Sequence, residues 1–240
     1  MRRATLVTAL AFAVLTSACG SSADSYDIGV TGNASPATRL GIIETSRGRP
    51  VGIGILHALI VPGDLSTLYH EHPQEVGRGE FMLDVPALPM SEYDIWMERT
   101  MSGGHRDAIL RRFTMTLKGG QPRGDRNDER RIALKPMSAE LRAGKPSRLE
   151  FSLLLDGQLV RRYGKFVGIE VHSFAVSSDR EFFVHDHATP VSNGVVKAHF
   201  TFPRAGDYVV FLQPTVLTED GKELRTVLRH AVTIPKDVRP

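Results

Sequence analysis

Apolar and β-branched residues occur along this chain in short runs bounded by proline, glycine and aspartate, which is the pattern of β-strands. In the first half these runs cover residues 52–61, 80–85 and 93–98. In the second half they cover residues 148–155, 158–163, 168–176, 181–185, 195–202, 208–212 and 226–234. No segment keeps a helical period with capping residues for more than two turns. The pattern therefore predicts an all-β protein.

Turn signals refine this prediction. Asp156-Gly157 separates two of the runs and is a strong signal for a two-residue hairpin. The turn before Tyr208, at residues 203–207, leads into a strand that opens with tyrosine, which is common in immunoglobulin-like (Ig-like) secreted domains. The first half keeps the corresponding Tyr93 but has Ser91 where the second has Gly206. Short strands with frequent turns predict two tandem Ig-like β-sandwich domains.

The boundary between the two domains is marked by a charged segment. Residues 118–131 contain no apolar side chain apart from one proline, so they have no face to bury. We therefore expect a first β-sandwich repeat at 26–117, a linker at 118–131 and a second repeat at 132–240. Each repeat has its own strand set, so we expect each to fold independently.

Three histidines in the first repeat recur in the second. His57, His70 and His72 correspond to residues 115 positions later, namely His172, His185 and His187. The two segments, 57–100 and 172–215, align without a gap although few other residues match. A residue kept only for packing would have changed as freely as its neighbours, so the repeated triplet indicates a function.

Simple hairpin geometry places each triplet on one face. If the turn lies between Gly63 and Asp64, His57 and His70 are directly opposite each other, with Cβ atoms about 4.5–5.5 Å apart. His72 follows two residues later and shares their face, whereas Glu71 points the other way. The same face carries apolar residues, so we expect the histidines at the rim of each sandwich. The second repeat gives the same arrangement around a turn between Ser178 and Asp179.

Imidazole nitrogens without a thiolate suit Cu(II) or Zn(II) better than magnesium or calcium. We therefore expect one three-histidine metal site in each repeat, holding copper or zinc. The alternative is that the cross-strand histidines pack together without an ion. Several methionines in the first repeat favour that repeat if Cu(I) is bound: Met82, Met90, Met97, Met101 and Met115.

The N-terminal segment indicates export. Arg2 and Arg3 precede a mostly apolar stretch, residues 4–17, that is too short to span a bilayer permanently. The segment 16–19 ends in Cys19, the only cysteine, and resembles the lipobox of bacterial lipoproteins. The resemblance implies a signal peptide at 1–18, lipidation of Cys19, a tether at 19–25 and a lipid-anchored protein of the bacterial cell envelope. If Cys19 is incidental, the protein is secreted.

Composition excludes several classes of function. The chain has 30 basic and 27 acidic residues, and Arg2 and Arg3 lie in the expected signal peptide, so no clustered positive surface for nucleic acid is indicated. The sequence lacks the nucleophile elbow, the phosphate loop and the zinc-protease motif, so we expect no enzyme.

The histidine pattern also carries a family resemblance. The order of His57, Asp64, His70 and His72, with Pro73 following, resembles that of uncharacterised bacterial secreted proteins with tandem sandwich domains, which are loosely similar to periplasmic copper-handling domains. This resemblance implies metal binding. We expect delivery, buffering or sensing of a transition metal, with a metal-donor or metal-acceptor protein as partner. The alternative is a non-catalytic adaptor lipoprotein that binds a protein partner without metal.

Overall fold

All regular structure in the described part of the protein is β-sheet. The computed structural model describes residues 26–46, 49–50, 55–86, 88–100, 109–119, 131–191 and 194–236, and no α-helix occurs among them. None of these segments therefore offers a helix of the length and hydrophobicity that crossing a bilayer requires. The predicted all-β class and the two tandem sandwiches are confirmed.

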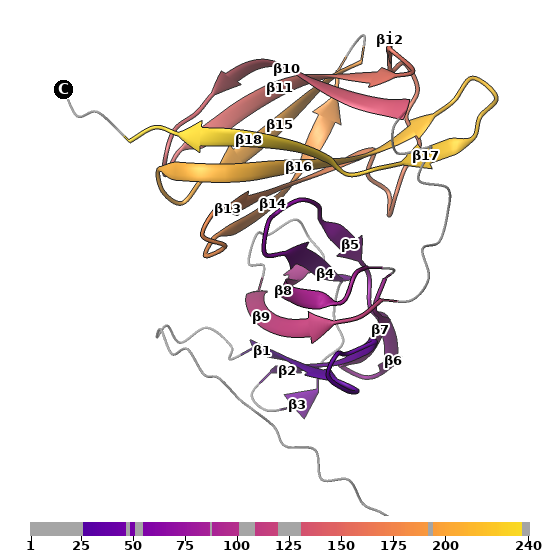
Figure 1. Cartoon of the computed structure of the whole chain (residues 1–240), viewed down its shortest axis with the longest axis vertical. Helices are drawn as coiled ribbons and strands as arrows, with labels where there is room; N and C mark the ends of the chain where they lie inside the picture. Colours follow the sequence, from indigo (N-terminus) through magenta and orange to yellow (C-terminus); the bar gives the residue numbers. More distant parts are fainter. Residues whose placement is uncertain are drawn as a thin grey trace, which may run out of the picture.

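The first repeat is a sandwich of two antiparallel sheets (Figure 1). One sheet has the order β1-β2-β7-β6, with β3 beside β2, and the other has the order β5-β4-β8-β9. The strands are β1 (Tyr26–Gly32), β2 (Arg39–Ser46), β3 (Arg49–Pro50), β4 (Ile55–Pro62), β5 (Tyr69–Glu71), β6 (Gln74–Gly77), β7 (Glu80–Asp84), β8 (Ser91–Thr100) and β9 (Ile109–Leu117).

The second repeat has nine strands in one continuous pairing order, β10-β11-β15-β14-β13-β16-β17, with β12 beside β11 and β18 beside β16. Strand β14 pairs with β13 through residues 183–188 and with β15 through Thr189 and Pro190. The sheet therefore folds over at β14 into two layers. The strands are β10 (Ile132–Glu140), β11 (Pro146–Leu155), β12 (Gln158–Leu159), β13 (Val171–Ser177), β14 (Phe183–Pro190), β15 (Val195–Thr201), β16 (Gly206–Leu217), β17 (Glu223–Arg225) and β18 (Leu228–Ile234).

The predicted turns are present. Asp156 and Gly157 have positive φ angles of 50° and 81°, and β11 pairs with β12 across them as expected for a hairpin. The tyrosine that opens each long strand donates its hydroxyl to a carbonyl four residues earlier, from Tyr93 to Pro89 at 2.9 Å and from Tyr208 to Arg204 at 3.2 Å. Both repeats therefore close the same corner of an Ig-like sandwich, although only the second has the glycine.

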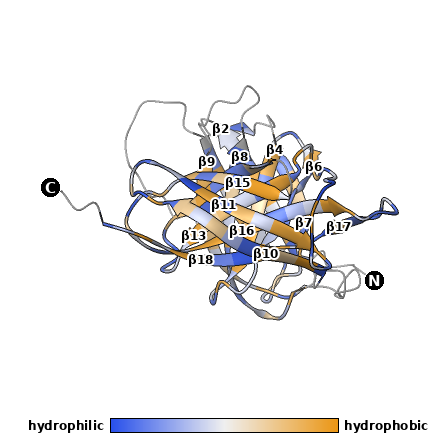
Figure 2. Cartoon of the chain, turned by 90° about the horizontal axis from the view of Figure 1, so that it is seen from above, coloured by the Kyte–Doolittle hydropathy of each residue, from blue (hydrophilic) through white to orange (hydrophobic). Residues whose placement is uncertain are grey.

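Each sandwich has its own apolar core. In the first repeat, Ala58 and Ile60 of β4 pack with β2, β7 and β8. In the second, Val171 and Ala175 of β13 pack with β11, β15, β16 and β18. Figure 2 shows hydrophobic and hydrophilic positions interleaved along individual strands, as expected for strands that pair one buried face with one open face.

A third core lies between the two repeats. It is formed by the opposite faces of β4 and β8 in the first repeat and of β13 and β16 in the second, which Figure 1 shows stacked one above the other. Its buried members are Leu59, Val61, Leu65, Leu68, Trp96, Phe174, Val176, Phe183, Val209 and Phe211. The apolar residues that share a face with the histidines therefore form an interface between the repeats.

Two polar contacts also join the repeats beside this core. Arg180 donates to the fully buried carboxylate of Asp94 at 2.9 Å, and Arg229 donates to the carbonyl of Leu65 at 2.8 Å. Separate folding of 26–117 and 132–240 stays a prediction. Each half alone would expose the face that forms this interface, and residues 120–130 of the expected linker lie outside the described residues.

Candidate metal centre

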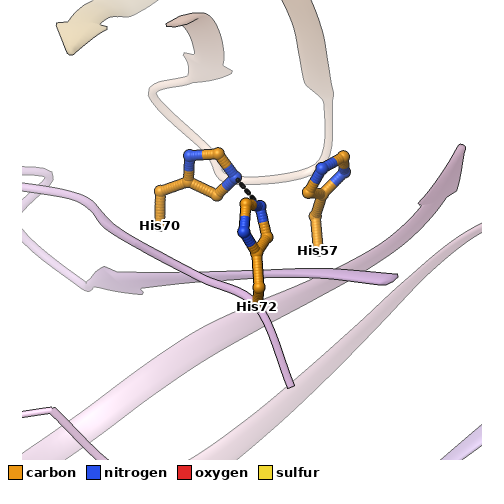
Figure 3. A group of neighbouring side chains, drawn as sticks. All are labelled: His57, His70 and His72. Atoms are coloured by element: carbon orange, nitrogen blue, oxygen red, sulfur yellow. Dashed lines mark hydrogen bonds between the residues drawn. The ribbon is translucent and has the colours of Figure 1, made fainter. Parts of the chain in front are cut away.

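The six repeated histidines gather at one end of the surface between the repeats. His57 lies on β4, His70 on β5 and His72 directly after β5, while His172 lies on β13 and His185 and His187 lie on β14. Figure 3 shows the first three rings rising from the strands of the first repeat toward the ribbon of the second. The site therefore sits at the interface and not at the rims of two separate sandwiches.

The face of each histidine was predicted correctly, but the register was not. His70 stands opposite Leu59 and His185 opposite Phe174, two residues away from the predicted partners. The turns are longer than the two-residue turns expected, and each contains a residue with positive φ, 53° at Leu65 and 61° at Arg180. A shift of two residues preserves the face, because side chains alternate with a period of two.

Histidines from the two repeats contact one another directly. The ring centroids of His70 and His172 are 4.7 Å apart, and those of His57 and His185 are 5.2 Å apart. Within the first triplet, Nε2 of His70 and Nε2 of His72 are 3.1 Å apart (Figure 3). Metal–nitrogen bonds of about 2.0–2.1 Å in a tetrahedron place two nitrogens about 3.3 Å apart, so this pair is close to ligand spacing.

Both triplets meet a simple distance criterion for one ion. In each triplet, one nitrogen from every ring lies within 4.8 Å of the others. A third group, His57, Glu98 and His185, meets the same criterion and joins the two repeats. The donor set is imidazole with one carboxylate, which suits zinc and copper.

In three of the rings, a hydrogen bond determines which nitrogen carries a proton. A carbonyl or carboxylate oxygen only accepts, so Nδ1 of His70 donates to Gln213 Oε1 at 3.0 Å and Nε2 of His172 donates to the carbonyl of Phe166 at 3.0 Å. Likewise Nδ1 of His185 donates to Glu98. In the neutral form of each ring the other nitrogen carries a lone pair, which is the arrangement found in metal-ligating histidines.

Two of these lone pairs are buried and have no hydrogen-bond partner among the described residues. They are Nδ1 of His172 and Nε2 of His185, both in the second triplet. A buried polar atom without a partner costs about 1–3 kcal/mol. His172 and His185 belong to one group whose ligand atoms lie within 4.8 Å of one another, and a metal ion coordinated by these two nitrogens would satisfy both.

The surroundings keep several of these rings neutral. Burial, with a contribution from His172, lowers the pKa of His70 to about 2. Burial is also the main reason that the pKa of His172 falls to about 3 and that of His72 to about 4. Only neutral imidazole coordinates a metal ion, so these rings are in the binding form at neutral pH.

Glu98 is the one carboxylate within the cluster. Burial alone would raise its pKa, but hydrogen bonding to His185 and the nearby His57 lower the pKa to about 2. Its side chain is only 12% exposed, and its Oε2 lies 3.7 Å from Nδ1 of His57. Glu98 thus places a buried negative charge within the histidine cluster.

Aromatic side chains close the cluster. Phe166 stacks on His72, with ring centroids 5.4 Å apart and planes inclined by 9°, and Phe174 stacks on His185 at 4.7 Å. Phe166 belongs to a tight turn whose residues Val167 and Gly168 have positive φ angles of 49° and 84°. His187 is exposed, so it forms the side of the cluster that opens to solvent.

Other residues singled out in the sequence lie elsewhere. Glu71 and Asp186 alternate with the histidines and pair with Ala58 and Ser173, so they lie on the opposite face of their strands, as predicted. Met97 belongs to the first sandwich core, on the face of β8 opposite to Glu98, so it does not create a softer site beside the histidines. Cys19 and Met101 lie outside the described residues.

Sequence reasoning missed three residues of the site: Glu98, Gln213 and Phe166. Glu98 and Gln213 are also separated by 115 positions, so the repeat alignment contained the signal. A further signal was the lack of alternation in β4 and β13, where nearly every residue is buried. Strands without alternation are buried on both faces, which indicates that a second surface covers them.

Comparison with family models gives a match over the second repeat. The model of a family described as a domain of unknown function (DUF8832) matches residues 125–231, which include β10 to β17. No curated protein matches the chain.

Several solved structures resemble the chain weakly. A tetra-tandem repeat from the extending region of a large adhesion protein has 11% identity and a TM-score of 0.29, covering 88% of this chain and 49% of that one. MtrC from Shewanella baltica OS185 has 6% identity and a TM-score of 0.31, covering 90% and 71%. A Ca²⁺-stabilized adhesin of an Antarctic bacterium has 10% identity and a TM-score of 0.27, covering 90% and 50%. This chain spans about half the length of the two adhesin chains, and likenesses this weak carry no argument about function.

Proposed function

We propose that this protein binds transition-metal ions, copper or zinc, through the histidine cluster between its two repeats. The observation that carries the proposal is the pair of buried lone pairs on His172 and His185, which lack a hydrogen-bond partner among the described residues. The two triplets, with nitrogens within 4.8 Å in each, supply enough ligands for one ion per triplet. The proposed role is stoichiometric binding for delivery, buffering or sensing, without catalysis.

The proposed location is the bacterial cell envelope, with a lipid anchor on Cys19. It rests on the basic and apolar start of the sequence and on the resemblance of residues 16–19 to a lipobox. Under this proposal a metal-donor or metal-acceptor protein of the envelope would exchange ions with the exposed side of the cluster at His187.

Calorimetric titration of the metal-free soluble chain, residues 20–240, with Zn(II) and Cu(II) tests this function. We expect about two ions per chain, because there are two triplets. Replacing both His185 and His187 with alanine should reduce the number to about one. His199→Ala is the matched control, since this histidine is exposed on β15 and lies outside the cluster, and it should leave the number unchanged.

The contrary result is binding no tighter than that of the variant in which all six histidines are replaced. That outcome would favour the adaptor alternative, in which the cluster only packs the repeats together. Calorimetric titrations at several protein concentrations would distinguish ion binding from aggregation.

A further inference from the structure

Glu98 and Gln213 occupy the same position of the repeat, 115 residues apart, on β8 and β16. Glu98 accepts a hydrogen bond from Nδ1 of His185, and Gln213 accepts one from Nδ1 of His70. Both contacts cross from one repeat to the other. Exchanging the two repeats converts the first contact into the second, so the pair has the symmetry of a pseudo-two-fold axis.

When an oxygen accepts a hydrogen bond from one imidazole nitrogen, it also fixes the direction in which the second nitrogen of that ring points. The ring can no longer rotate freely, and the proton is held on the nitrogen that does not coordinate. For His185 this leaves Nε2 as the nitrogen with the lone pair, and that atom is buried without a partner among the described residues. For His70 it leaves Nε2, which lies 3.1 Å from His72 Nε2.

We propose that each repeat supplies the positioning residue for the other repeat's metal site, Glu98 for the second triplet and Gln213 for the first. This inference rests on the proposed metal binding and deepens it. Each triplet takes its three histidines from one repeat, but the residue that orients one of these rings comes from the other repeat. Docking of the repeats and ordering of the metal ligands are therefore one event.

The two positions differ in chemistry, so the two sites are unequal. A carboxylate makes its imidazole partner a stronger electron-pair donor to the metal ion, and it adds a negative charge near that ion. An amide only orients the ring. The second triplet, supported by Glu98, is thus the tighter site for divalent ions. The first, supported by Gln213, is the weaker one.

The test exchanges carboxylate and amide at the two positions while keeping their shapes. Glu98→Gln is examined in the His57→Ala/His70→Ala/His72→Ala background, which removes the first triplet and breaks the group of His57, Glu98 and His185, so that only the second triplet is intact. Gln213→Glu is examined in the His185→Ala/His187→Ala background, where only the first is intact. Affinity for Zn(II) is measured by competition with a chelator, and the Cu(II) electron paramagnetic resonance spectrum reports the ligand field.

We expect Glu98→Gln to weaken the second site by about 10–100-fold, the usual cost of losing an outer-shell partner. We expect Gln213→Glu to strengthen the first site and both changes to alter the Cu(II) spectrum. Arg180→Gln is the structural control, because it removes a contact between the repeats at Asp94 without touching a histidine. It should lower the thermal midpoint but leave the spectrum unchanged.

Affinities that change less than threefold in both variants, with unaltered spectra, would overturn this inference while leaving metal binding intact. A change of the same size in Arg180→Gln would also overturn it, because Glu98 would then act only through the stability of the interface. Absence of binding to the unaltered chain would instead overturn the proposed function.

Discussion

The surface between the two repeats has an apolar half and a histidine half, and the two halves lie on the same strands. On β13, for example, Phe174 and Val176 belong to the apolar half, while His172 on the same face belongs to the histidine half. The apolar half consists of buried hydrophobic side chains, and its one buried polar side-chain atom without a partner in the described structure is Nε1 of Trp96. The histidine half contains buried atoms that lack partners in the described structure. The apolar half packs the two repeats against each other, and the histidine half carries the metal site that we propose.

The largest effect should come from the apolar half. Phe174 is fully buried in the third core, so Phe174→Ala removes a ring and leaves a cavity. We expect a loss of about 3–5 kcal/mol in the free energy of unfolding, measured by denaturant titration of the metal-free chain.

Phe174→Leu is the matched control, because the equivalent position of the first repeat is Leu59, which is also fully buried in this core. The leucine variant should lose much less free energy of unfolding than the alanine variant. An alanine variant as stable as the parent would mean that the interface contributes nothing to the fold.

The histidine half should make the metal-free protein sensitive to acid. The pKa values of His70 and His172 lie at about 2 and about 3, well below the value of about 6.5 expected in the unfolded chain. Above pH 6.5 both states are neutral at these residues, so stability should not change with pH on their account. As pH falls below 6.5, only the unfolded chain takes up these protons, so stability falls.

The expected slope of the free energy of unfolding against pH follows from the number of protons that the chain takes up on unfolding. Two groups that are protonated only in the unfolded state give at most about 2.7 kcal/mol per pH unit. Urea titrations of the metal-free chain at pH 7, 6, 5.5 and 5 should show this loss. His199→Ala should leave the slope unchanged, whereas a flat profile in the parent would contradict the burial of the two rings.

The smallest effect on stability should come from the exposed edge of the histidine half. His187 is solvent-exposed, so His187→Ala should change the free energy of unfolding of the metal-free chain by less than about 0.5 kcal/mol. Affinity at the second triplet should nevertheless drop, because one of its three ligands is lost. Equal losses in stability and in affinity would indicate that His187 acts in packing.

Much of the local arrangement was predictable from the sequence. The runs of apolar residues located most strands that carry the histidines, and the spacing of His70 and His72 placed them on one face. The register was displaced by two residues, because a tight turn was expected where Leu65 instead adopts a left-handed conformation. A leucine gives no sequence signal for that conformation, which is usual for glycine and asparagine.

The sequence by itself determined that the protein is built from β-strands, that it contains two copies of one pattern, and that each copy gathers three histidines on one face. Those features follow from periodicity along the chain, which is a local property. Only the tertiary structure decided that the two histidine faces meet, and that Glu98 and Gln213 each reach across to the other repeat. The reason is physical: contacts between remote surfaces depend on how two completed sheets pack, and the spacing of residues within one strand does not encode that packing.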